Sequence, residues 1–141
     1  MKKIAIISCT KLKQDYPCDV KTMYQKSDLF SKIVKYIEGQ DYTAWYVISA
    51  KHGLLSSEQI IEPYDITLNN MKARERKRWA ESTANQIVEL GVHTIDIYAG
   101  QKYREYLIPL LEEHNIVCHV PMMGLGIGQQ LKFLKERILG N

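Results

Sequence analysis

Short apolar segments rich in β-branched residues alternate along the chain with amphipathic segments at helical spacing. The apolar segments are 3–8, 43–50, 93–99 and 116–120, and the helical ones lie near 28–38, 71–89, 102–113 and 129–139. Strands that alternate with helices are joined by right-handed crossovers and form a mostly parallel sheet. The pattern therefore predicts one three-layer α/β domain over residues 1–141, with a central sheet of about four strands and helices on both faces.

Two stretches show no clean period, residues 9–23 and 56–70, and both are expected to be irregular. The second contains Pro63, and a loop of this length in a compact domain is usually functional or mobile. Ser27 is expected to cap the first helix and Gly39 to end it.

Composition limits the class of protein. The chain has 141 residues, of which 45% are hydrophobic and 25% are charged, so it can bury a core and is neither disordered nor a coiled coil. No apolar run approaches the roughly 20 residues that span a bilayer, and no cleavage site follows the basic start. We expect a cytoplasmic protein with no membrane partner; the oligomeric state stays open.

Cysteine, histidine and charge counts restrict cofactors and partners. Three cysteines without CxxC spacing indicate free thiols, and the four histidines show no metal-ligand spacing. We therefore expect no metal and no cofactor. The formal net charge of +3 permits a nucleic-acid partner without requiring one.

Ligands of open α/β sheets bind beyond the carboxyl ends of the strands, so the four strand exits are expected to converge on one rim. These exits are 9–13, 49–54, 100–103 and 122–129. The first strand exit carries Cys9, Lys11 and Lys13. Two ammonium groups there favour binding of a phosphate or a carboxylate, and a thiol beside them could be a nucleophile. The alternative is a small buried cysteine with solvated lysines.

The second strand exit carries Ser49, Lys51, His52 and Gly53. Gly53 permits a sharp turn, and an imidazole can act as acid or base near neutral pH. We expect all four in the site, although a polar surface turn would have the same composition.

Two further segments are candidates for ligand contact. Tyr64 and Asp65 lie in the long irregular stretch, where a carboxylate could act as a base and a phenol ring could stack on a nucleobase. The alternative is a Pro-initiated turn. The glycines before the last helix allow close backbone approach to a phosphate or base, and a tight structural turn is the alternative. This segment comprises Gly124, Gly126, Gly128 and Gln129.

Basic residues crowd the start of the long helix, where they oppose the helix dipole. Lys72, Arg74, Arg76 and Arg78 could contact a phosphate backbone, whereas a solvated face is the alternative. Trp79, in the same stretch, is expected to pack against the core.

Several segments together resemble a family of small uncharacterised bacterial and phage proteins. They are 9–13, 24–30, 45–55, 63–65 and 124–129, of which SAKHGLL (49–55) is the most specific. That family is distantly similar to the YaaA peroxide-stress proteins. The resemblance implies an α/β fold similar to uracil-DNA-glycosylase-like domains, and related domains occur beside enzymes of 7-deazaguanine modification in nucleic acids.

The expected function is an enzyme that recognises a nucleobase or nucleotide, free or within DNA or RNA, and acts at an N-glycosidic bond. Because its transition state has oxocarbenium character, a carboxylate is useful, and Asp65 is expected in that role. His52 or Lys51 would protonate or stabilise the departing base. Lysines 11 and 13 with the 124–128 backbone would hold phosphate, and Tyr64 would stack.

Two alternatives stay open. The protein could be a non-catalytic nucleic-acid-binding or stress-response protein that uses its basic helix start. It could also be a nucleoside deoxyribosyltransferase-like enzyme that acts on free nucleosides.

Overall fold

The computed structural model describes residues 3–139 and is built on a five-stranded sheet of order β4-β3-β1-β6-β7. Its parallel strands are β1 (Lys3–Ser8), β3 (Ala44–Ser49), β6 (Thr94–Tyr98) and β7 (Val117–His119). The edge strand β4 (Gly53–Ser56) pairs antiparallel with β3. The predicted mostly parallel sheet is confirmed, and β4 raises the strand count from four to five.

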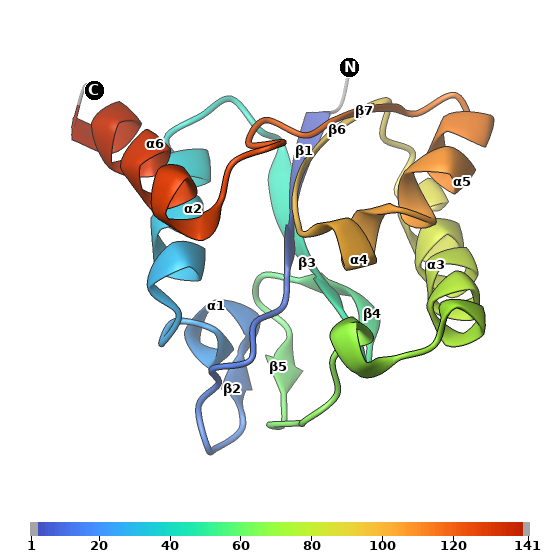
Figure 1. Cartoon of the computed structure of the whole chain (residues 1–141), viewed down its shortest axis with the longest axis horizontal. Helices are drawn as coiled ribbons and strands as arrows, with labels where there is room; N and C mark the ends of the chain where they lie inside the picture. Colours follow the sequence, from blue (N-terminus) through green and yellow to red (C-terminus); the bar gives the residue numbers. More distant parts are fainter. Residues whose placement is uncertain (1–2, 140–141) are drawn as a thin grey trace.

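Helices cover both faces of the sheet, as predicted (Figure 1). On one face α2 (Asp28–Glu38) packs against α6 (Ile127–Leu139), and on the other α3 (Ala73–Val88) packs against α5 (Leu107–Glu113). The strand β1 lies between these layers and is buried from Ile4 to Ile7. Within residues 3–139, no helix is both long and apolar enough to cross a membrane.

The two stretches expected to be irregular contain short elements. They are β2 (Cys18–Asp19), α1 (Val20–Met23), β5 (Ile60–Ile61) and the 3-10 helix η1 (Leu68–Asn70). Strands β2 and β5 form a separate antiparallel pair, which lies below the carboxyl ends of the parallel strands in Figure 1. Elements of two to four residues are too short to show a period, so the sequence pattern missed them.

Local chemistry sets the helix boundaries. The Ser27 hydroxyl oxygen accepts a hydrogen bond from the Phe30 backbone N–H at 3.2 Å, which confirms the predicted cap of α2. The helix expected over 102–113 is instead divided into α4 (Gln101–Arg104) and α5. Pro109 explains the division, because proline lacks an N–H and is tolerated only in the first turn of a helix.

The chain order places a crevice between β1 and β6. From β1 the chain crosses over α2 to β3, whereas from β6 it crosses over α5 to β7 on the other side. The chain thus leaves the two neighbouring strands toward opposite faces of the sheet. The place between their carboxyl ends is the topological switch point, where ligands of doubly wound sheets bind.

Candidate functional site

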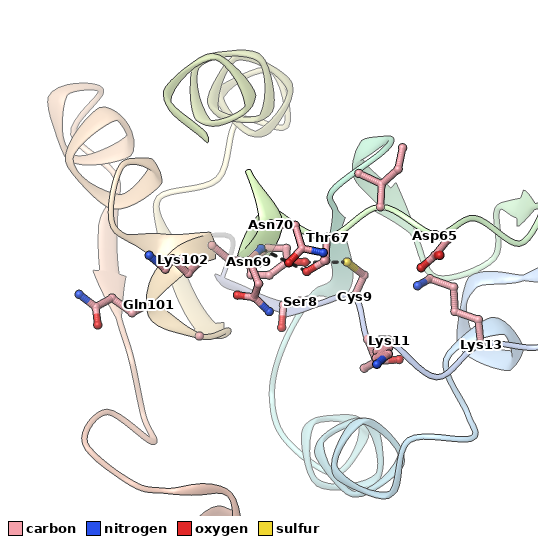
Figure 2. A pocket seen from close by; sticks show the side chains of 14 residues that line it. Ser8, Cys9, Lys11, Lys13, Asp65, Thr67, Asn69, Asn70, Gln101 and Lys102 are labelled. Carbon is pink, nitrogen blue, oxygen red and sulfur yellow. Dashed lines mark hydrogen bonds between the residues drawn. The ribbon is translucent and has the colours of Figure 1, made fainter. Parts of the chain in front are cut away.

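A cavity of about 550 Å³ opens at this switch point, and we call it the lysine cavity (Figure 2). Its volume lies within the range of about 300–1,000 Å³ that is typical of small-molecule sites. Three segments supply its walls: the exit of β1, the connection between β5 and α3, and the exit of β6. They contribute Ser8, Cys9, Thr10, Lys11, Lys13; Asp65, Ile66, Thr67, Asn69, Asn70; and Gly100, Gln101, Lys102 and Tyr103.

The charges on these walls favour an anionic ligand. Lys11, Lys13 and Lys102 bring three ammonium groups, against the single carboxylate of Asp65. Figure 2 shows the Lys13 ammonium and the Asp65 carboxylate directed toward each other. Partial burial lowers the pKa of Lys13, and the nearby Asp65 charge opposes that shift.

Cys9 lines the lysine cavity at the first position after β1. Its side chain is 8% exposed, and its Sγ lies 3.3 Å from the Tyr103 hydroxyl. Burial raises the pKa of Tyr103. The thiol is therefore paired with a neutral phenol.

Three hydroxyl groups form a chain beside the cavity. The Ser49 hydroxyl donates to the Tyr64 oxygen at 2.7 Å, and the Tyr64 and Tyr24 hydroxyls lie 2.5 Å apart. Ser49 is fully buried, and its oxygen also accepts the backbone N–H groups of Lys51 and His52. Burial raises the pKa of both tyrosines. Ser49 and Tyr64 therefore join β3 to the segments around it and lie outside the lysine cavity.

The ring of Tyr64, the expected stacking residue, has two partners within the protein. The Lys13 ammonium lies 4.5 Å from the ring centroid, and the His52 ring meets it edge-on with centroids 5.5 Å apart. Lys13 thus connects this aromatic pair to the lysine cavity.

Lys51 and His52 lie in the turn of the β3–β4 hairpin, Gly53 begins β4, and all three lie outside the lysine cavity. Lys51 is exposed. Burial, and secondarily the Lys51 charge, lowers the pKa of His52, whose Nε2 is buried with no hydrogen-bond partner among the described residues. Gly53 has φ of +70°, and a Cβ there would lie 2.3 Å from Gln86 Oε1. Gly53 is thus required by the hairpin itself.

The glycine-rich segment, which runs into the first turn of α6, also lies outside the lysine cavity. Gly124 adopts φ of +84°, which a side chain would strain. The Gln129 side chain accepts the Gly126 backbone N–H at 3.0 Å and so caps the start of α6. Gly126 and Gly128 are exposed. These contacts are those of a structural turn.

The basic residues at the start of α3 divide into two kinds. Lys72, Arg74 and Arg78 are exposed. Arg76 has a side chain only 11% exposed, pairs with Glu105 at 3.1 Å and donates to the Met71 carbonyl. Arg76 is therefore engaged within the protein, unlike the other three.

Trp79 packs against the core, as predicted. Its indole N–H donates to the Ser49 carbonyl at 2.8 Å, and its ring meets Tyr103 edge-on.

Sequence reasoning placed the segment 100–103, at the exit of β6, on the ligand rim, and the cavity lining contains that segment, although Gln101 and Lys102 were not named as site residues. It missed Thr67, Asn69 and Asn70 altogether. The two asparagines lie on η1, and nothing in the local sequence points to their position. Across residues 3–139, no group of three or more His, Cys, Asp or Glu side chains is placed to hold a metal ion.

The fold and this cavity define a doubly wound α/β protein with a lysine-lined cavity at its switch point. The chain belongs to a family of unknown function, DUF6884, whose model matches residues 4–136. The uncharacterized protein YfjM of Bacillus subtilis (strain 168) is 28% identical over 149 residues, which cover 98% of this chain and 96% of the relative. No solved structure gives a significant match. The expected membership of a small uncharacterised bacterial family is thus confirmed.

Proposed function

We propose that the lysine cavity binds a nucleotide and that the protein acts at its N-glycosidic bond. One observation carries the proposal: a single carboxylate, Asp65, lines a switch-point cavity together with three ammonium groups. Ammonium groups bind phosphate as point charges, and amides at the same site can bind sugar hydroxyls. The amides available are those of Asn69, Asn70 and Gln101.

In this proposal Asp65 stabilises the positive charge that develops on the sugar. The bond between C1′ and the base nitrogen breaks, and its electron pair leaves with the base. Water adds to C1′, and the proton that it loses to Asp65 passes to the departed base. His52 and Lys51, first expected to protonate the base, lie outside the cavity, so Asp65 is the residue on which this proposal depends.

The resemblance to YaaA peroxide-stress proteins and to uracil-DNA-glycosylase-like domains is a further part of the proposal. It supports a substrate related to nucleic acids. The GQDPY sequence, the water-activating motif of uracil-DNA glycosylases, is absent from the chain. Activation of water would therefore fall to a different carboxylate, and Asp65 is the one that lines the lysine cavity.

A second candidate function is binding of a nucleic-acid strand without catalysis. It is favoured by the exposed Lys72, Arg74 and Arg78, which follow the cavity residues Asn69 and Asn70 directly along the chain. A transferase of free nucleosides is the third candidate, and its substrate would carry no phosphate group for the lysines of the cavity to bind.

The first test compares ligands by their effect on thermal unfolding, because a ligand of the native state raises its stability by mass action. The panel contains bases, nucleosides, nucleoside 5′-monophosphates, ribose 5-phosphate and short DNA and RNA strands. We expect the monophosphates to bind. Stabilisation by the DNA or RNA strands alone, lost at higher salt, would support nucleic-acid binding without catalysis. Stabilisation by unphosphorylated nucleosides alone would support the nucleoside transferase.

Variants then test the roles of single residues. Lys11→Ala and Lys102→Ala should each weaken monophosphate binding by about 10- to 100-fold, as expected for loss of a charged contact. Lys135→Ala is the matched control, because Lys135 is an exposed lysine of α6 outside the lysine cavity. Asp65→Asn should retain binding and lose release of the base. Full base release by Asp65→Asn would refute the assignment.

A further inference from the structure

A second cavity, of about 200 Å³, lies on the α2–α6 side of the same crevice, and we call it the apolar cavity. It shares Ser8, Thr10 and Gly100 with the lysine cavity. These three residues lie at the exits of β1 and β6, so the two cavities meet where the strands end.

The two cavities differ in chemistry. The apolar cavity is walled by Phe30 and Ile33 of α2, Tyr98 at the end of β6, and Met122 and Ile127 beside and within α6. Among the described residues, its lining contains no charged side chain. A ligand that fills both cavities must therefore be anionic at one end and apolar at the other.

Two polar side chains in the apolar cavity retain unused hydrogen-bonding capacity. The Ser27 oxygen accepts the Phe30 N–H, which leaves its O–H free to donate. The Gln130 amide nitrogen donates to the Leu125 carbonyl at 2.9 Å, which leaves its carbonyl oxygen free to accept. One donor and one acceptor among apolar walls suit the polar edge of a heterocycle.

We propose that the apolar cavity holds the heterocyclic base of the nucleotide whose phosphate lies among the lysines of the other cavity. The assignment rests on the proposed function. Apolar cavities of about 150 Å³ are known to hold a benzene ring, so the volume is sufficient for a base. The sugar then lies at Ser8, Thr10 and Gly100, between the two cavities.

This placement also explains the position of the carboxylate. Asp65 lines the lysine cavity and is absent from the lining of the apolar cavity among the described residues. In this proposal it faces the sugar from the lysine cavity, across from the base, where a carboxylate can stabilise positive charge at C1′ as the base departs.

The test uses calorimetric titration of uridine 5′-monophosphate, adenosine 5′-monophosphate and ribose 5-phosphate. Ile127→Trp narrows the apolar cavity at a residue that is 68% exposed, so folding should be retained. Met123→Trp is the matched control, because Met123 is 61% exposed in the connection that leads into α6 and lies outside the cavity lining. Leu29→Trp fills the cavity from α2 as a second variant.

We expect a nucleotide to bind at least about tenfold more tightly than ribose 5-phosphate, a difference of about 1.4 kcal/mol. Ile127→Trp should abolish that difference and leave ribose 5-phosphate binding unchanged, whereas Met123→Trp should bind as the natural chain does. Equal affinities for nucleotide and ribose 5-phosphate would overturn the base assignment alone. Absence of binding by all three phosphorylated probes would overturn the proposed function with it.

Discussion

The glycine of the SAKHGLL stretch offers a test of whether that stretch is structural. In Gly53→Ala, the new methyl group would meet the Gln86 side-chain oxygen at 2.3 Å, while the backbone would keep φ of +70°. The Gln86 oxygen already accepts the Leu54 backbone N–H at 3.0 Å. The substitution therefore strains the backbone and displaces a hydrogen-bond acceptor.

These two effects set the expected magnitude. A non-glycine residue in the left-handed region costs about 1–2 kcal/mol. Loss of the hydrogen bond between Gln86 and Leu54 costs about 0.5–1.5 kcal/mol, because the exposed side chain can move away. The free energy of unfolding of Gly53→Ala should thus fall by about 1.5–3.5 kcal/mol.

Urea unfolding followed by circular dichroism measures this loss. In a Gln86→Ala background the 2.3 Å contact is gone and Thr83 Oγ1, at 3.3 Å, is the nearest oxygen, so Gly53→Ala should cost mainly the backbone share of about 1–2 kcal/mol. Gly128→Ala is the control, since Gly128 lies in α6 and a Cβ there would meet open space. This substitution should raise the free energy of unfolding by about 0.5–1 kcal/mol. A loss below about 0.5 kcal/mol in Gly53→Ala would refute the reasoning.

Three further predictions concern charge and titration. Arg76→Ala should lower the free energy of unfolding by about 1–3 kcal/mol, because it leaves the partly buried Glu105 unpaired, whereas Arg74→Ala on the exposed surface should change it by less than about 0.5 kcal/mol. The lowered pKa of His52 means that the unfolded chain binds a proton more readily, so stability should fall as the pH drops below about 6.5, and less so in His52→Phe. Burial raises the pKa of Cys118 to about 11, so iodoacetamide at pH about 8 should modify it slowly in the folded protein and faster in urea.

Each of these has a result that would count against it. Equal losses of unfolding free energy in Arg76→Ala and Arg74→Ala would show that the ion pair between Arg76 and Glu105 contributes nothing to stability. Superimposable pH profiles for the natural chain and the histidine variant would remove His52 as the titrating group. Labelling of the thiol at the same rate with and without urea would contradict its burial.

The parallel strands could be predicted because each lies in a short run of apolar and β-branched residues, and that pattern is local. The strand β4 could not, since four residues from Gly53 to Ser56 show no period and their pairing depends on a positive φ and on Gln86, which is distant in sequence. The division between α4 and α5 had a local cause in Pro109, and the apolar spacing concealed it.

The strand-exit rule succeeded at β1 and gave a misleading result at β3. Cys9, Lys11 and Lys13 line the lysine cavity because β1 exits at the switch point. After β3 the chain turns back at once to pair as the edge strand, so Lys51 and His52 serve a hairpin beside the site. The rule cannot distinguish these cases, because both exits carry a lysine and polar neighbours.

The connection between β5 and α3 contributes five cavity residues, from Asp65 to Asn70, and adds no strand to the main sheet. In a minimal crossover, β3 would lead directly to α3, and this part of the wall would not exist. Ligand choice and folding are therefore encoded in separable parts of the chain. Exchange of this connection between relatives could change what the protein binds while the register of the parallel strands stays the same.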